Sequence, residues 1–137
     1  MHEGGCHCGT VKYEILGDPI NHSLCHCSDC RGNSGAPMVG WLMLTEDALN
    51  VTQGEPNIYE SSEHGRRHFC GDCGTGLFYS NSDLIPGFVD VQSATLENPD
   101  VLEPENHIQT MDRISWMLDA HKLPEFEAFP PQEEEDA

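Results

Sequence analysis

The stretch Gly4-Gly5-Cys6-His7-Cys8-Gly9 holds two of the seven cysteines of this 137-residue chain. The other five stand in only two further clusters, C-x-C-x-x-C over Cys25, Cys27 and Cys30, and C-x-x-C over Cys70 and Cys73. Thiols that only filled a hydrophobic core would be scattered along the chain at strand or helix spacing. Clusters this tight predict that the thiols share metal ions, and zinc is the ion that such spacings usually hold.

The number of thiols suggests two ions. Seven thiolates exceed the four that one tetrahedral zinc site uses, and four plus three is the natural division. A structural zinc takes four protein ligands, whereas a catalytic zinc commonly takes three and keeps one position open. The two outer clusters can clamp one ion and staple the fold, and the triplet (Cys25, Cys27 and Cys30) can hold a second ion with a vacancy.

Local geometry is compatible with this division. Zn–S bonds of about 2.3 Å place ligand sulfurs about 3.8 Å apart, so the backbone must bend at C-x-C. Gly4, Gly5 and Gly9 flank the first cluster and allow that bend.

Other interpretations of the cysteines stay open at this point. A disulfide framework is disfavoured by the odd number of thiols, and a thioredoxin-like C-x-x-C needs a strand-to-helix context that Cys70 and Cys73 lack. A single zinc site with three spare thiols is the strongest competitor. His26 can complete the triplet or shuttle a proton, although a side chain that alternates with Cys25 and Cys27 should face elsewhere.

Composition excludes several classes of function. Six Lys and Arg against 24 Asp and Glu give a net charge of −18, which repels phosphate backbones and argues against nucleic-acid binding. No run of 18 apolar residues occurs, so we expect no membrane span. Clustered free thiols need a reducing compartment, and we expect a cytoplasmic protein.

The remaining sequence predicts many short strands punctuated by Gly and Pro turns, which is typical of antiparallel sheets. Strands are expected at residues 10–16, 20–25, 37–44, 50–53, 58–61, 66–70, 75–79, 88–93 and 107–110, with short helical segments at 45–49 and 114–118. We therefore predict a mainly β fold of antiparallel, zinc-stapled sheets with few short helices. It forms one compact domain over residues 1–130, followed by an acidic, disordered tail over 131–137. An exposed apolar face on Pro37–Leu44 would support a homodimer.

Three segments carry a resemblance to a known family. They are Gly4-Gly5-Cys6-His7-Cys8-Gly9 with Val11-Lys12-Tyr13, Cys25-His26-Cys27-Ser28-Asp29-Cys30-Arg31 with Gly35, and Phe69-Cys70-Gly71-Asp72-Cys73-Gly74-Thr75. In this order and with these neighbours they resemble the glutathione-dependent formaldehyde-activating enzyme family, which also includes the centromere protein V group. The likeness extends over about residues 3–130, including Thr95-Leu96-Glu97-Asn98-Pro99 and Trp116.

The resemblance implies roles for the clusters. The first C-x-C and the late C-x-x-C share a structural zinc, which maps onto Cys6, Cys8, Cys70 and Cys73. Cys25, Cys27 and Cys30 map onto the open, catalytic site. The implied activity is that of a carbon–sulfur lyase, which joins glutathione or another small thiol to formaldehyde or a related aldehyde.

Two functions from different classes follow. The first is this thiol-adduct enzyme, and the alternative is a non-catalytic zinc module that binds a protein partner or buffers metal. Three thiolates leave the open site with a net negative charge, which blunts its Lewis acidity. An anionic thiol needs a local cation, and Arg31, directly after the triplet, is the predicted carboxylate clamp.

Several residues near the cysteine clusters are expected to have structural or surface roles rather than functional ones. Arg66 and Arg67 are expected to be surface charges on opposite faces of a strand. His68 is expected to be a partly buried strand residue, with a hydrogen-bonding position near the closed zinc site as the alternative. Trp41 and Trp116 are assigned to the core, and Trp116 can instead form the wall of a pocket.

Overall fold

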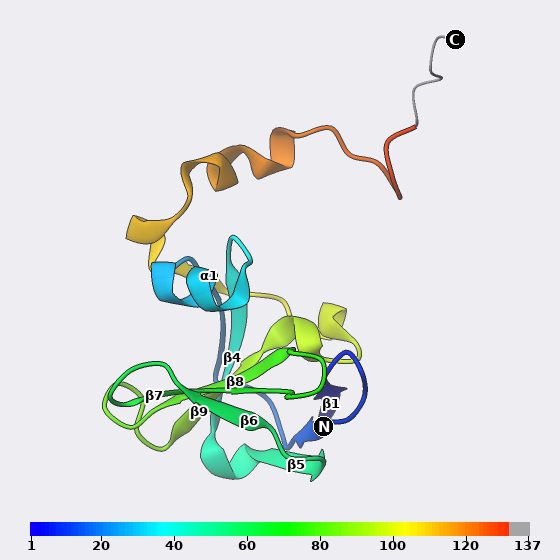
Figure 1. Ribbon diagram of the computed structural model, residues 1–137. Coiled ribbons are helices and arrows are strands. Elements are labelled where there is room, and N and C mark those ends of the chain that lie inside the picture. The colour runs from blue at the N-terminus through cyan, green and yellow to red at the C-terminus, as the bar shows by residue number, and fades with distance from the viewer. Residues whose placement is uncertain (132–137) are drawn as a thin grey trace.

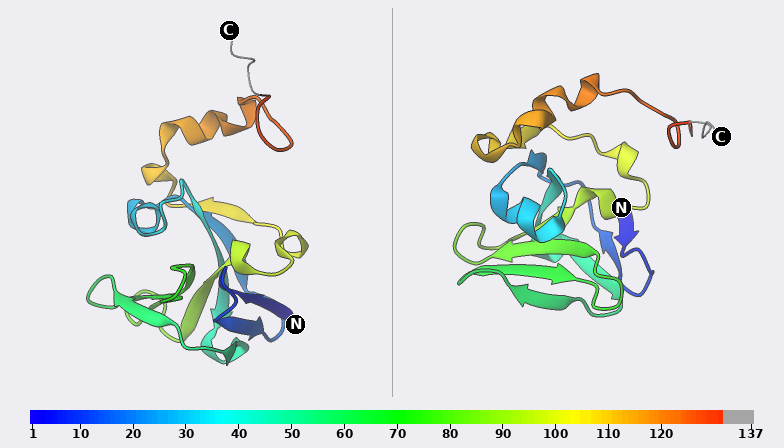
Figure 2. Two further views of the ribbon diagram at one scale, coloured as in Figure 1. Left: turned by 45° about the vertical axis from the view of Figure 1, so that its right-hand side comes forward. Right: turned by 45° about the horizontal axis from the view of Figure 1, so that its top comes forward.

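The computed structural model describes residues 1–131, and these build two β-sheets and one α-helix. The small sheet has the order β1-β2-β5, and the large sheet has the order β10-β3-β4-β9-β8-β7-β6. Figures 1 and 2 show the helix α1 beside the large sheet and residues 113–131 leading away from the two sheets. The predicted boundary at residue 130 and most of the predicted tail over 131–137 lie at or beyond the end of the described residues, and they stay predictions.

The elements follow one another closely along the chain. The strands are β1 His2–Gly5, β2 Lys12–Ile15, β3 Asn21–Cys25, β4 Val39–Thr45, β5 Leu49–Gln53, β6 Asn57–Glu60, β7 Gly65–Phe69, β8 Gly76–Asn81, β9 Phe88–Gln92 and β10 Asn106–Ile108. The helix α1 covers Ser28–Ser34, and short 3-10 helices cover Glu46–Ala48, Ser93–Thr95, Pro99–Val101, Thr110–Asp112 and Ser115–Lys122. Among residues 1–131, no helix has both the length and the apolar composition that crossing a bilayer requires.

The predicted mainly β, antiparallel fold is confirmed, with one departure. Neighbouring strands pair antiparallel except β10, which lies parallel to β3 with His107 opposite Leu24 and Ile108 opposite Cys25. A parallel partner must come from far along the chain. Here it brings residues 106–108 beside the strand that leads into the triplet.

The main core lies between the two sheets. Tyr13 and Ile15 of β2 pack against Leu42 and Leu44 of β4 and against Val91 of β9, and all five are buried. Because strand side chains alternate between faces, Val39 and Trp41 of β4 point to the opposite side. There they form a second, smaller cluster with Cys25 of β3 and Cys30 of α1. One face of the large sheet is therefore structural, and the other carries α1 and the triplet.

Three local expectations were wrong or incomplete. The segment Pro37–Leu44 does not offer an exposed apolar face for a dimer, because β4 is paired on both sides and Trp41, Leu42 and Leu44 are buried. Trp116 is not a core residue, since 59% of its surface is exposed. The helix α1 and the strand β1 were not predicted, because Gly32 interrupts the helical segment and Gly4 and Gly5 weaken the strand signal.

Candidate metal centres

The first cysteine group, which we call the tetrad, comprises Cys6, Cys8, Cys70 and Cys73. The four sulfur atoms all lie within 4.8 Å of one another. The Sγ atoms of Cys6 and Cys8 are 3.7 Å apart, and those of Cys8 and Cys70 are 3.8 Å apart. These separations match the edge of a zinc–thiolate tetrahedron, about 3.8 Å, and are far longer than a disulfide bond of about 2.0 Å.

Two tight turns bring the tetrad together. Backbone bonds close the first turn between Cys6 N and Val11 O (3.0 Å) and the second between Cys70 N and Thr75 O (3.0 Å). The turns also bind each other, because the Thr10 hydroxyl donates to Asp72 at 3.2 Å. Bonds from the Thr75 hydroxyl and from backbone groups lower the pKa of Cys73 to about 5, which favours the thiolate that a metal ion requires.

The second group is the triplet, which joins the end of β3 to the start of α1. Cys25 ends the strand, Cys27 caps the helix, and Cys30 lies in its first turn. The Cys27 sulfur accepts the backbone N–H of Cys30 at 3.2 Å, and the sulfurs of Cys25 and Cys30 are 3.9 Å apart. Cys25 and Cys30 are buried, and Cys27 is half-buried.

The triplet has three donors and no fourth. Within residues 1–131, no further His, Cys, Asp or Glu joins the group of sulfurs that lie within 4.8 Å of one another. His26 is buried and points away, and its Nε2 lies 2.9 Å from Nδ1 of His107 on β10. The expectation that His26 faces elsewhere therefore agrees with its position.

Mutual hydrogen bonding makes the triplet thiols unequal. The hydrogen bond from Cys25 is the largest influence on Cys30, and together with Cys27 and Arg67 it outweighs burial and lowers the pKa of Cys30 to about 5. The same bond, reinforced by burial, raises the pKa of Cys25. Cys30 therefore carries the negative charge of the group most readily.

Arg67 lies beside Cys30, and its assignment as a surface charge was wrong. The residue is only 5% exposed, and its Nη2 lies 2.7 Å from Oδ2 of Asp29 and 3.7 Å from Sγ of Cys30. The guanidinium also stacks over the Tyr79 ring, 4.7 Å from its centroid. In the register of β7 and β8, Arg67 and Tyr79 are direct partners and face α1. Sequence alternation indicated that only one of Arg66 and Arg67 faces any one site, but not which.

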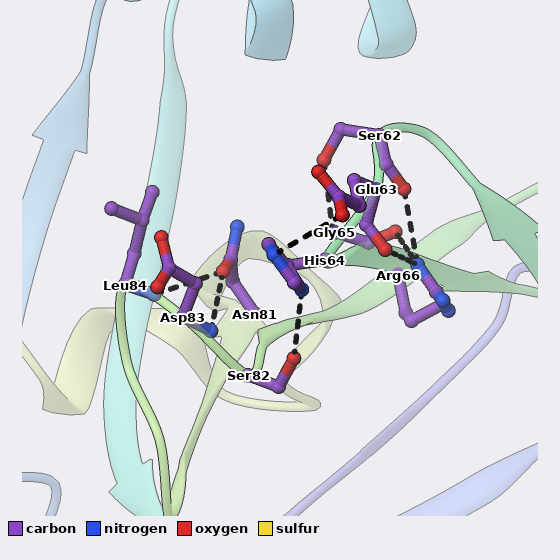
Figure 3. A network of polar contacts seen from close by, with 9 residues as sticks. All are labelled: Ser62, Glu63, His64, Gly65, Arg66, Asn81, Ser82, Asp83 and Leu84. Atoms are coloured by element: carbon purple, nitrogen blue, oxygen red, sulfur yellow. Dashed lines mark hydrogen bonds and ion pairs between the residues drawn. The ribbon is translucent and has the colours of Figure 1, made fainter.

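Arg66 is held on the hairpin that joins β6 and β7. Its Nη1 donates to the carbonyl groups of Ser62 at 3.1 Å, Glu63 at 3.2 Å and Gly65 at 2.8 Å (Figure 3). These bonds fix the hairpin and leave Arg66 without any recorded contact to the triplet. The expectation for Arg66 agrees with this position.

The predicted clamp, Arg31, donates to two backbone carbonyl groups. Its Nε lies 3.3 Å from the oxygen of His26, and its Nη2 lies 3.2 Å from the oxygen of Asp112. These bonds connect α1 to His26, between two triplet cysteines, and to Asp112, which follows β10. A role for Arg31 in binding a substrate carboxylate stays a prediction.

A cavity of about 460 Å³ is lined at one end by α1 and elsewhere by Gly74 and Thr75, which follow Cys73; no triplet cysteine lines it, but Trp41 and Arg67 connect it to the triplet. The rest of the lining comes from β4, β7, β8 and β9, and its polar and aromatic members include Asn33, Ser34, Trp41, Arg67, His68 and Gln92. Trp41 packs against the triplet, and Arg67 contacts Cys30. The half-buried His68 has a pKa lowered by burial, which keeps its ring neutral at physiological pH. The cavity therefore offers a bound molecule hydrogen bonds and one buried cation.

Both cysteine groups suit a thiophilic metal. Soft thiolate donors at tetrahedral spacing select zinc over magnesium or calcium, which prefer oxygen. The tetrad can enclose an ion completely, whereas the triplet can hold one and leave a position for an external ligand.

Comparisons with known proteins give one family for most of the chain. The family model "Glutathione-dependent formaldehyde-activating enzyme" matches residues 1–112. A putative glutathione-dependent formaldehyde-activating enzyme of Halomonas elongata is 26% identical over 127 residues, covering 84% of this chain and 78% of that protein. An uncharacterized lyase of Schizosaccharomyces pombe is 27% identical over 79 residues, covering 58% of this chain and 57% of that protein.

A solved structure gives the same result for the fold. A crystal structure of a Rhodobacter sphaeroides protein superposes with a TM-score of 0.61 at 26% identity. The superposition covers 77% of this chain and 98% of that protein.

Proposed function

The chain belongs to the family of glutathione-dependent formaldehyde-activating enzymes, and from this membership we propose that it joins a small thiol to an aldehyde at the triplet. In this reaction the thiol loses its proton, the sulfur forms a bond to the carbonyl carbon, and the carbonyl oxygen takes up a proton. The product is an S-hydroxyalkyl adduct. Glutathione and formaldehyde are the substrates that the names of the family and of its Halomonas elongata member suggest.

The observation that carries the proposal is the incomplete ligand set of the triplet. Three free thiols converge on one point, and no fourth donor among residues 1–131 joins them. A zinc ion held there would stabilise an incoming thiolate and polarise the carbonyl group of the aldehyde. The tetrad has no such vacancy, so we assign it a structural role.

The cavity that Trp41 and Arg67 connect to the triplet suits the part of the thiol molecule that does not react. Trp41 supplies an apolar wall, and Asn33, Ser34 and Gln92 supply hydrogen bonds for peptide-like groups. Cys25 and Cys30 are buried, so two of the three sulfur donors are shielded from water. Binding both substrates in one orientation removes most of the entropy cost of bringing them together, which raises the rate of reaction.

The test combines zinc content with the rate of adduct formation. We expect two zinc ions per chain, and a rate of adduct formation from glutathione and ¹³C-formaldehyde, followed by NMR, above the uncatalysed rate. The variant Cys27→Ser should keep the fold, lose one ion and fall to the background rate. Absence of any rate above background, for glutathione and for smaller thiols, would favour a metal-buffering or partner-binding module instead.

A further inference from the structure

The charge of the triplet poses a problem for its proposed chemistry. Three thiolates outweigh one divalent cation, so the loaded triplet carries a net negative charge before substrate arrives. A thiolate entering the open position adds another negative charge. Like charges this close repel strongly in a half-buried site, where the effective dielectric constant is lower than in water. A nearby cation is therefore needed if a thiolate is to bind well.

Arg67 is placed to supply this cation. Arg67 is buried, with only 5% of its surface exposed, and its Nη2 lies 3.7 Å from the Cys30 sulfur. Among residues 1–131, no other arginine or lysine has a recorded hydrogen bond to a triplet sulfur, since Arg31 donates to backbone carbonyl groups. A guanidinium group keeps its positive charge in proteins, so Arg67 is a permanent cation beside the triplet.

The surroundings of Arg67 fix it in place without using its full hydrogen-bonding capacity. The Tyr79 ring supports the guanidinium from one side, and the Asp29 carboxylate, in a side chain that is 70% exposed, holds Nη2. Its Nε is buried and has no partner among the described residues. A buried donor without a partner is costly, and such groups are often retained for function. Arg67 also lines the cavity, so it links the triplet to the space proposed for the substrate.

We infer that Arg67 is a positioning residue that offsets the thiolate charge of the triplet and so determines how tightly an incoming thiolate is held. The inference rests on the proposed function and names the substrate form, a thiol that binds as its anion. The Asp29 carboxylate binds the same guanidinium group and partly neutralises its charge, so it reduces the attraction of Arg67 for a thiolate. The two partners of one ion pair are therefore expected to have opposite effects on thiol binding.

Thiol binding to the cobalt-loaded protein, measured without aldehyde, tests this directly. Glutathione and the uncharged thiol 2-mercaptoethanol are each titrated while the sulfur-to-cobalt absorption is followed. Loss of one hydrogen bond to a charged group is worth about 1.5–3 kcal/mol, so Arg67→Met should weaken both thiols by about 10- to 100-fold. Arg66→Met is the matched control and should leave both affinities unchanged.

Asp29→Asn separates a charge effect from a purely structural one. If the ion pair only stabilises the fold, Asp29→Asn and Arg67→Met weaken thiol binding together. If Arg67 acts through its charge, Asp29→Asn keeps or strengthens binding, and Arg67→Lys restores part of what Arg67→Met loses. Should Arg67→Met fail to fold, the Asp29→Asn and Arg67→Lys variants still decide between these cases.

Two outcomes overturn the inference. One is wild-type affinity for both thiols in Arg67→Met, and the other is a parallel loss in Arg67→Met and Asp29→Asn. Either would leave the proposed function intact, provided that the wild-type protein binds thiols. If the wild-type cobalt protein binds no thiol at the triplet, the proposed function fails as well, and the two failures are thereby distinguished.

Discussion

The carboxyl group of Asp90, on the α1 side of the large sheet, has a pKa that its buried surroundings change. Cross-strand pairing sets Asp90 opposite Tyr79 and Met43, and no ion pair or hydrogen bond of its side chain is recorded within residues 1–131. Burial, with a smaller contribution from the charge of Cys30, raises its pKa from 3.8 to about 6. The folded protein therefore binds this proton more tightly than the unfolded chain does.

The sign of the stability effect follows from this difference. Between pH 3.8 and about 6 the folded state holds more protons, so the Asp90 carboxyl costs stability increasingly as pH rises through this window. We expect Asp90→Asn to raise the free energy of unfolding by about 1–2 kcal/mol at pH 8 and by about half as much at pH 5. Urea denaturation at both pH values, with zinc content checked, measures the gain. Asp83→Asn, at an exposed position, should show no such gain, and an equal gain at both pH values would contradict the assignment.

Individual residues also mark the limit of sequence-based reasoning. The cysteine spacings predicted which sulfurs would gather, and the structure brings the same residues together. The burial of Arg67 was not predictable, because it depends on the register between β7 and β8 and on the direction in which α1 crosses the sheet. The two adjacent arginines in the sequence show neither this register nor the direction of α1.

The helix α1 is short, and its two glycines play different parts. Gly35 follows the helix with φ of +74°, and its N–H bonds to the carbonyl of Arg31 at 2.8 Å. Gly32 lies inside the helix, and an added Cβ would meet nothing within 4 Å. Only Gly35 has a backbone conformation that L side chains rarely adopt.

Alanine at these two positions should change stability in opposite directions. Gly35→Ala is expected to cost about 1 kcal/mol, because alanine resists the left-handed conformation. Gly32→Ala is expected to gain about 0.5–1 kcal/mol through helix propensity. Thermal unfolding of the two variants side by side checks the prediction, and a shift of the same sign in both would refute it.

At the level of elements, the pattern of apolar residues was the strongest signal. Alternation placed β2 and β3 to within about two residues at each end, and a continuous apolar run placed β4 equally well, because both of its faces are buried. The helix α1 lacked such a pattern, since only Cys30 among its seven residues is buried. The parallel pairing of β10 with β3 is a contact between distant segments, and local sequence carries no information about it.

We expect the fold of the whole molecule to depend on the tetrad more than on the triplet. The tetrad joins the first turn of the chain to the segment after β7, and Cys6 and Cys70 belong to the main core. The triplet is complete within one local segment on the other face of the sheet. Loss of an ion should therefore have different consequences at the two sites.

We expect Cys70→Ser to abolish cooperative folding, whereas Cys27→Ser keeps it. A structural zinc supplies about 10–16 kcal/mol in small zinc domains, which is as much as the 5–15 kcal/mol or so that stabilises a typical domain. Circular dichroism and zinc content of the two purified variants provide the measurement. Equal loss of folded structure in both variants would contradict the division between the sites.

The distance along the chain between the tetrad cysteines has a consequence for biosynthesis. Cys8 and Cys70 are 62 positions apart, and ribosomes add about 5–20 residues per second, so the first thiols wait about 3–12 seconds for their partners. During that interval Cys6 and Cys8 can be oxidised or can bind another metal ion. The three triplet cysteines, in contrast, lie within six residues and are synthesised almost together. We therefore expect Cys6 and Cys8 to be more easily oxidised in the newly made chain than in the folded protein, where all four tetrad thiols lie together.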